Sequence, residues 1–170
     1  EGPSKEFIKK GGDLEGIQLW LNLPASKKMM PANYQHLKSE YIPVIENDDE
    51  TIQLKVIAGT QNDKVGLIKT QTAVNVFTLK TKESGSLEIS IPEDHQSLVY
   101  LLDGEILINE STVLKKGEIQ MVVFNEDGNV IKIEAKDTSN LLVLSGAPIK
   151  EKITQYGPYV MNTQTEIMEA

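Results

Sequence analysis

Between residues 51 and 146 the chain alternates apolar and polar positions in short runs, which Gly and Asp residues interrupt at short spacing. A period of two places successive side chains on opposite sides of a strand, so each run predicts a strand with one buried face. We expect strands at residues 52–58, 65–68, 74–79, 87–91, 98–102, 106–108, 119–124, 130–134 and 141–144. Many short strands without helices between them favour an antiparallel β-sandwich or barrel. The predicted fold class is therefore all-β.

The stretch that organises this pattern is residues 97–124, where two turn signals separate apolar runs. Asp103-Gly104 and Lys116-Gly117 supply residues that tolerate a positive φ, as tight hairpin turns require. The stretch therefore predicts a central double hairpin. We expect one buried row on each of its outer strands: Leu98, Tyr100 and Leu102 on the first, and Ile119, Met121 and Val123 on the second.

The segment before the predicted barrel carries weaker signals. Residues 1–16 are polar and rich in Gly and Lys, which is typical of a loop or arm. Residues 17–22 alternate and are followed by Pro24, so we expect a strand there. Trp20 in this strand is expected to plug the core, because a large aromatic ring gains most from burial. A short helical turn is expected after Pro31.

The predicted barrel begins with an edge strand and is followed by a helix. Residues 41–45 read as an edge strand, because Pro43 has no N–H to donate to a neighbouring strand. At the other end of the chain, Thr163 and Glu166 have the spacing of a capping box, in which each satisfies a backbone N–H of the first turn. We therefore expect a short C-terminal helix.

Composition narrows the possible partners. The chain of 170 residues has no Cys, so disulfides and thiolate chemistry are absent, and we expect a reducing compartment, the cytoplasm. All 17 basic residues are lysines and the net charge is −8. Without Arg, and with an acidic field that repels a polyanion, direct binding to nucleic acid is not expected. No apolar run approaches the ~20 residues of a membrane-spanning helix, so no membrane partner is expected either.

The titratable residues give no catalytic constellation. His36 and His95 lie in polar surroundings and are expected at the surface. The acidic runs at residues 46–50 and 93–94 are expected to be solvated turns, because nothing apolar flanks them to raise a carboxyl pKa. The sequence contains no Gly-rich phosphate loop, no Ser-His-Asp arrangement and no zinc-ligand spacing.

The order of predicted elements in residues 97–124 resembles the pattern around the metal motifs of the cupin family: a short strand, Asp-Gly, a second strand, a polar loop and then Lys-Gly. Metal-binding cupins place two His and one Glu before the Asp-Gly turn, and a third His after the next Gly. The matching positions here are Ser97, residues 90–91 and 92–93, and the neighbourhood of Gly128. They do not form a ligand set, because a divalent metal needs several convergent ligands. The resemblance therefore implies a metal-free cupin barrel.

The two ends of the chain sharpen the resemblance. The segments GIQLWLNLPASKKMMPANYQ at residues 16–35 and QYGPYVMNTQTEI at residues 155–167 closely resemble signature segments of the pirin family. Pirins are the two-barrel branch of the cupins. The resemblance implies that a first barrel binds one iron-like metal through three His and one Glu, and that the second barrel is metal-free.

The first residues, Glu1-Gly2-Pro3-Ser4, are similar to the segment that follows the last ligands of the pirin metal motif. The resemblance thus assigns Glu1 as the metal-binding glutamate, with the three His ligands upstream of it. We expect residues 1–40 to link from a missing N-terminal metal-binding barrel. Residues 41–148 would form the metal-free C-terminal barrel, and residues 149–170 a return segment and the start of a helix that members usually continue.

The resemblance also implies a function for the intact protein. Pirins resemble quercetin 2,3-dioxygenases, which open a flavonol ring with iron or another divalent metal. In this interpretation the present half is structural and has no catalytic residue of its own, and its partner is the missing barrel or a symmetry mate. The alternative is a metal-sensing module that binds other proteins, like a transcription cofactor.

Overall fold

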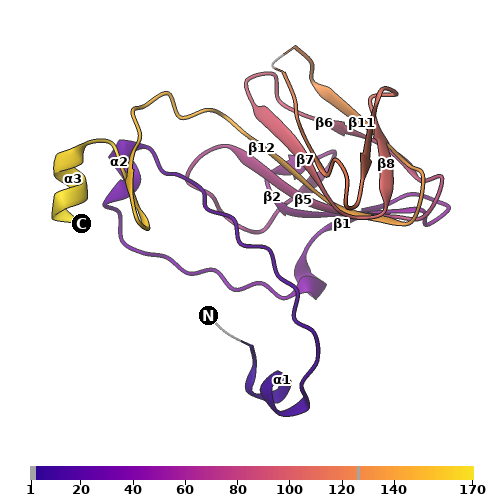
Figure 1. Cartoon of the computed structure of the whole chain (residues 1–170), viewed down its shortest axis with the longest axis horizontal. Coiled ribbons are helices and arrows are strands. Elements are labelled where there is room, and N and C mark those ends of the chain that lie inside the picture. The colour runs from indigo at the N-terminus through magenta and orange to yellow at the C-terminus, as the bar shows by residue number, and fades with distance from the viewer. Residues whose placement is uncertain (1–2, 126) are drawn as a thin grey trace.

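Two antiparallel sheets pack face to face in this computed structural model, which describes residues 3–125 and 127–170 (Figure 1). In the described part the larger sheet has the order β1-β2-β5-β12-β7-β10. Its strands are β1 Val44–Glu46, β2 Ile52–Ala58, β5 Val74–Thr81, β12 Ser139–Gly146, β7 Gln96–Asp103 and β10 Met121–Val123. The smaller sheet has the order β6-β11-β8-β9, with β6 Ser86–Ser90, β11 Val130–Ala135, β8 Glu105–Ile108 and β9 Thr112–Lys115. The expected antiparallel β-sandwich is confirmed.

The core lies between the two sheets and is built mainly from aliphatic side chains, with Phe77 among them. Phe77 of β5 and Leu141 of β12 are fully buried from one side, and Ile106 of β8 and Ile133 of β11 from the other. Each such side chain contributes about 1.5–3 kcal/mol by leaving water. Pairing in register aligns these residues, since Leu141 lies opposite both Leu79 and Leu101.

The buried face of β7 and β10 is the opposite of the one expected. Val99 and Leu101 are buried, whereas Leu98, Tyr100 and Leu102 point outward. On the second strand Ile119, Met121 and Val123 are exposed, and Val122 and Phe124 pack against the core instead. The prediction was wrong because β7 is apolar on both faces, so its alternation cannot show which face is inside.

The turns of residues 97–124 lie where expected, but they connect different strands. β7 and β8 belong to different sheets, so Asp103-Gly104 is a corner between sheets and not a hairpin loop. Gly104 has φ 91°, and a Cβ there would lie 2.7 Å from the Cα of Ser139. β9 and β10 also belong to different sheets, so the turn at Gly117 is a second corner between sheets. The hairpin of this stretch joins β8 to β9, so the predicted double hairpin was wrong.

The N-terminal segment is less regular than expected in one place and more regular in another. Residues 11–24 contain no helix or strand, so the predicted strand at 17–22 was wrong, and the segment has no partner strand in the described chain. The expected loop at the start includes helix α1, Lys5–Lys10, whose first turn is capped by the Ser4 side chain. The short helix α2, Ala25–Lys28, comes before Pro31 and not after it, and a 3₁₀ turn follows at Ser39–Tyr41.

The C-terminal segment forms a small unit beside the sandwich. β13, Thr154–Tyr156, pairs with β14, Tyr159–Met161, and helix α3, Gln164–Glu169, follows. The predicted capping box between Thr163 and Glu166 is confirmed. Figure 1 places this unit next to α2, away from the sheets. A second short hairpin, β3 Thr60–Gln61 with β4 Lys64–Val65, closes one end of the sandwich.

None of the helices in the described residues is long and apolar enough to cross a membrane.

Candidate functional site

The outer faces of the two sheets differ in chemistry. On the smaller sheet, Lys132 pairs with Glu110 at 2.6 Å and with Glu134 at 3.3 Å, and Lys115 pairs with Glu105 at 3.2 Å. The hydrogen bond to Glu110 is the main reason that the pKa of Lys132 lies above its usual range. Such exposed pairs add little stability, but they mark a face that remains in water.

The outer face of the larger sheet is apolar across three neighbouring strands, β10, β7 and β12. Met121 lies opposite Tyr100, and Val123 lies opposite Leu98. Leu98 in turn lies opposite Leu144 of β12. Met121 is 52% exposed and Val123 is 62% exposed, so this row is open to solvent. A contiguous exposed apolar surface of this kind marks an interaction or ligand site.

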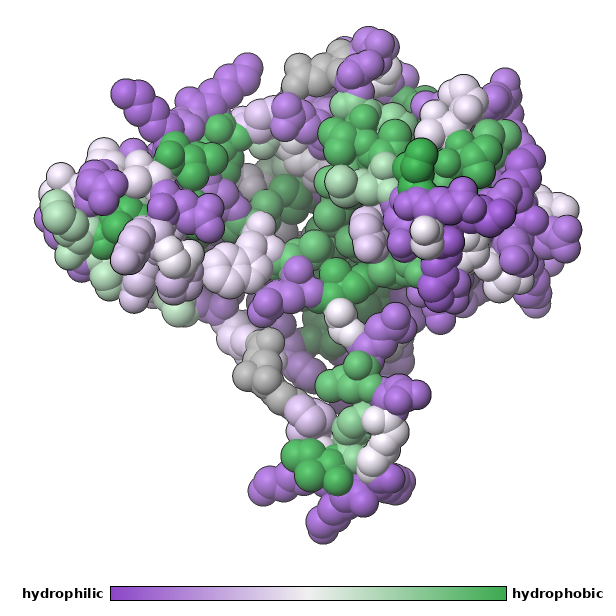
Figure 2. All heavy atoms as spheres, viewed as in Figure 1, coloured by the Kyte–Doolittle hydropathy of each residue, from purple (hydrophilic) through white to green (hydrophobic). Residues whose placement is uncertain are grey.

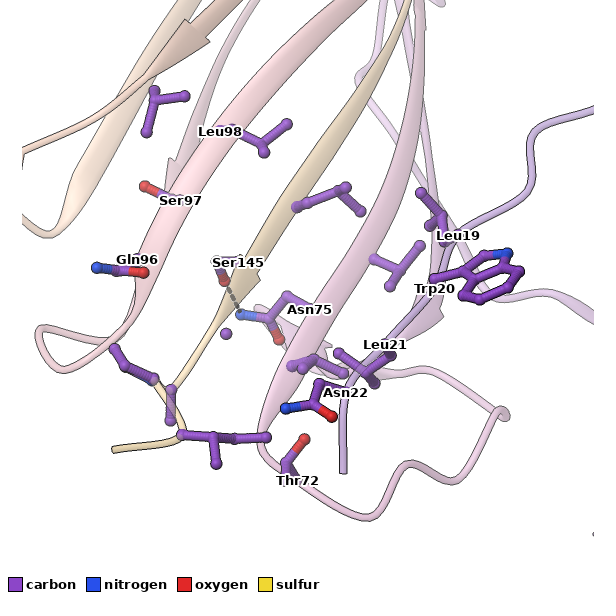
Figure 3. A pocket seen from close by; sticks show the side chains of 18 of the residues that line it. Leu19, Trp20, Leu21, Asn22, Thr72, Asn75, Gln96, Ser97, Leu98 and Ser145 are labelled. Carbon is purple, nitrogen blue, oxygen red and sulfur yellow. Dashed lines mark hydrogen bonds between the residues drawn. The ribbon is translucent and has the colours of Figure 1, made fainter. Parts of the chain in front are cut away.

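One end of this apolar face is hollowed into a groove of about 530 Å³. Leu98, Val123 and Leu144 from the sheet line it, together with the segment Leu19–Asn22 and residues 146–149 after β12. Figure 3 shows the sheet strands behind the groove with Leu19 and Trp20 beside them. Figure 2 shows apolar side chains gathered in the hollow between the sandwich and the C-terminal unit.

Hydrogen bonds connect the two walls of the groove. The backbone N–H of Ala25 donates to Glu151 Oε2 at 2.7 Å, which ties the N-terminal segment to the segment after β12. Lys28 Nζ donates to Asn22 Oδ1 at 2.7 Å and to the Val160 carbonyl at 3.0 Å. The two walls are therefore joined to each other and to the C-terminal unit.

Trp20 lies at the rim of this groove with 67% of its surface exposed. The expectation that it plugs the core was wrong. Its neighbours Leu19 and Leu21 are also about half exposed. Strand alternation assigned the segment to a sheet, but residues 17–22 pair with no strand of the described chain, and Leu19–Asn22 line a surface groove instead.

A buried polar relay adjoins the groove. Asn75 Nδ2 donates to Ser145 Oγ at 2.9 Å, and His95 Nδ1 lies 3.0 Å from the same oxygen. The Ser145 hydroxyl can donate to His95 Nδ1 in the Nε2–H tautomer, or accept from it in the Nδ1–H tautomer. The backbone N–H of Thr60 donates to Asn75 Oδ1 at 3.2 Å and joins the β3–β4 hairpin to the relay. Asn75 and Ser145 also line the groove.

His95 was expected at the surface, and this was wrong because the residue is only 8% exposed and its ring contacts Ser145. The backbone N–H of His95 closes a turn onto the Pro92 carbonyl, and the turn directs the ring inward. The polar sequence around His95 gave no sign that Ser145, in a distant strand, would lie within reach. His36 is exposed as expected and stacks on Tyr34 with ring centroids 6.5 Å apart.

The carboxylates behave as solvated turn residues. A hydrogen bond from the Thr51 side chain at 2.8 Å holds the pKa of Asp49 below its usual range. Likewise Lys116, which lies 3.0 Å from the Asp103 carboxylate, lowers the pKa of Asp103. A general acid needs the opposite shift, so these groups are not candidates for acid–base catalysis.

The described residues do not fit a metal ion. Within residues 3–125 and 127–170, no group of three or more His, Cys, Asp and Glu side chains lies close enough together to hold one. Ser97 lines the groove, Glu93 is exposed in a turn and Gly128 is exposed in a loop. Glu1, the one residue that the resemblance assigns as a ligand, lies outside the described residues.

The two packed antiparallel sheets, with a short C-terminal helix, define a protein of the cupin class. A crystal structure of quercetin 2,3-dioxygenase from Acinetobacter baumannii superposes with a TM-score of 0.82 and is 36% identical, covering 88% of this chain and 51% of that chain. The sequence model of the pirin C-terminal cupin domain matches residues 76–170. The chain therefore belongs to the pirin family, and the resemblance of its two end segments is confirmed.

Curated relatives extend the match beyond this region. The Pseudomonas aeruginosa protein named "Putative quercetin 2,3-dioxygenase" is 36% identical over 167 residues, which is 98% of this chain and 57% of that protein. Human pirin is 32% identical over 157 residues, which is 91% of this chain and 53% of pirin. The chain thus spans about half the length of the curated relatives it matches.

Proposed function

We propose that the intact protein is a metal-dependent quercetin 2,3-dioxygenase and that this C-terminal cupin half is structural and not catalytic by itself. The observation that carries the proposal is the outer face of the larger sheet beside the groove, where Tyr100 and Met121 lie opposite each other and are open to water. A face of this kind favours a permanent partner. The relation to proteins named as quercetin dioxygenases supports the assigned reaction.

The partner of this face in the proposal is the upstream metal-binding barrel, with a symmetry mate as the alternative. Residues 1–40 would then link the two barrels, residues 41–148 would form the metal-free barrel, and residues 149–170 would return along it. The proposed location is the cytoplasm. The absence of Arg and the net charge of −8 support a protein partner and argue against direct contact with nucleic acid.

The metal of the intact protein, iron or another divalent ion, would be held by Glu1 together with three His residues upstream of it. Three or four neutral or anionic ligands that converge on one site are what such an ion requires. A flavonol-like molecule would bind in that upstream barrel. The described residues of this half supply no ligand set of their own.

Comparison of two proteins tests the proposal: the 170-residue chain, and the same chain extended upstream by a first barrel. We expect the extended protein to bind one metal and to remove the visible absorbance of quercetin under air, and the short chain to do neither. Glu1→Gln in the extended protein should lower metal affinity and turnover together by about tenfold or more. Glu6→Gln is the matched control, since Glu6 only pairs with Lys10 on an exposed helix.

Turnover of quercetin by the 170-residue chain alone would contradict the proposal. An extended protein that binds metal tightly but does not consume quercetin would favour the alternative, a metal-sensing module that binds other proteins. The same apolar sheet face would then serve an external protein partner.

A further inference from the structure

The groove between Leu19–Asn22 and the larger sheet has the size and lining of a small-molecule site. Its volume of about 530 Å³ lies within the ~300–1,000 Å³ range of ligand pockets in proteins. We propose that it binds an uncharged, mainly apolar ring compound with one hydrogen-bonding group. The inference concerns this half of the protein and does not depend on the proposed dioxygenase reaction.

The absence of charge in the groove selects the ligand class. None of its lining residues is Asp, Glu, Lys, Arg or His, although a quarter of the chain is charged. A phosphate, carboxylate or ammonium group would lose its hydration in the groove without gaining an ionic partner. The ligand must therefore be neutral.

Polar groups at one side of the groove provide the hydrogen bonds. Asn75 and Ser145 lie together at the strand ends and are joined by a hydrogen bond (Figure 3). Ser145 also contacts His95 Nδ1. The Asn75 amide has two N–H bonds, and Ser145 accepts one of them. The other can donate to a hydroxyl or carbonyl oxygen of a ligand. The Ser97 hydroxyl, which also lines the groove, is a second partner.

The walls of the groove favour a small molecule over a protein surface. The hydrogen bonds of Ala25 to Glu151 and of Lys28 to Asn22 hold both walls in place beside the sheet. A flat protein surface would have to displace a wall to reach Leu98 and Leu144 inside the groove, whereas Tyr100 and Met121, on the part of the face proposed for the upstream barrel, do not line it. A ring compound of two or three rings fits between the walls, with Trp20 at the rim for aromatic contact.

A pair of related dyes tests the charge selection. N-phenyl-1-naphthylamine is neutral, and 8-anilinonaphthalene-1-sulfonate is the same ring system with a sulfonate. Trp20 is the single tryptophan, so energy transfer from it to a bound dye reports occupancy of the groove. We expect saturable binding of the neutral dye with quenching of Trp20. The sulfonate should bind about tenfold more weakly, even in high salt that screens the acidic field of the chain.

Two matched variants test the location. Val123 and Met121 lie on the same strand and the same face, and both are more than half exposed, but only Val123 lines the groove. Val123→Lys should weaken the neutral dye about tenfold or more, because it introduces a charge into the uncharged groove. Met121→Lys should change the affinity less than about twofold. Circular dichroism would confirm that both variants fold.

Trp20→Phe gives an independent measure. The directly excited dye should still bind, while energy transfer is lost. Equal binding of both dyes, equal weakening by Val123→Lys and Met121→Lys, or dye binding that leaves Trp20 emission unchanged would each overturn the proposal. It would also fail if sedimentation showed a dimer that Val123→Lys dissociates and that excludes the dye, because the groove would then be an interface between copies.

Discussion

The relay from Thr60 through Asn75 and Ser145 to His95 depends on one glycine. Gly59 has φ 83°, and a Cβ there would overlap Asn75 Oδ1 and lie 2.6 Å from the Val74 carbonyl oxygen. Gly59→Ala should therefore displace Asn75 and leave buried polar groups unpaired, in addition to the strain of a positive φ. We expect a loss of about 2–4 kcal/mol in the free energy of unfolding, measured by urea denaturation.

Gly117→Ala is the control for this substitution. Gly117 has a similar φ of 81°, but a Cβ there would meet no heavy atom within 4 Å. Only the strain of a positive φ remains, so the free energy of unfolding should fall by about 1 kcal/mol. Equal losses for the two variants would show that the close approach of Gly59 to Asn75 does not matter.

Single residues were the least predictable level of this molecule. The sequence identified His95 as polar and loop-borne, which is correct, but its burial depends on Ser145 in another strand. Trp20 was assigned to the core from its size, whereas its neighbours place it at the rim of a groove. Both outcomes depend on contacts between distant segments, which a local pattern does not contain.

At the scale of elements, strand positions were predictable and strand pairing was not. Runs such as residues 52–58 and 106–108 match β2 and the last residues of β8, because Gly and Asp mark their ends. The corner at Gly104 and a hairpin loop carry the same turn signal, although only a hairpin joins paired strands. The apolar outer face of β7 then hid which side was buried, since both faces of the strand suit a core.

Helix α3 should be sensitive to acid. The hydrogen bond from the Thr163 side chain holds the pKa of Glu166 below its usual range. A lowered carboxyl pKa stabilises the fold above the unfolded pKa of about 4.3, and this stabilisation is lost as pH falls through the folded pKa. The protection factors of residues 164–169 against amide exchange, measured by NMR and corrected for the slower intrinsic exchange in acid, should therefore fall when the pH is lowered below about 4.

Glu166→Gln separates this effect from general acid unfolding. A glutamine keeps one hydrogen bond of the capping box but has no charge to lose. In this variant the protection of α3 against amide exchange should therefore fall only together with the protection of the sheets as the pH is lowered. An unchanged acid dependence in Glu166→Gln would assign the effect to another carboxylate, such as Asp49 or Asp103.

At the scale of the whole molecule, the outer faces of the two sheets differ in polarity. The smaller sheet presents the ion pairs of Lys132 and Lys115, and the larger sheet presents Tyr100, Met121 and Val123. Sequence resemblance predicted a metal-free half of a two-barrel protein, yet it gave no information on which surface a partner would cover. The difference in charge between the faces supplies that information, because burial of an apolar face is favourable at about 25 cal/mol per Å².

Methionine oxidation tests which face is covered. Met121 is 52% exposed on the larger sheet, and Val113 is 47% exposed on the outer side of the smaller sheet. In the 170-residue chain carrying Val113→Met, peroxide should oxidise both methionines at rates within about threefold, since their exposure is similar. In the same variant extended by the upstream barrel, Met121 should oxidise about tenfold more slowly, because the barrel removes it from water. The methionine introduced at position 113 should be oxidised at the same rate as in the 170-residue chain, measured by mass spectrometry of peptides. Protection of the introduced methionine without protection of Met121 would place the partner on the charged sheet and refute the proposed docking face.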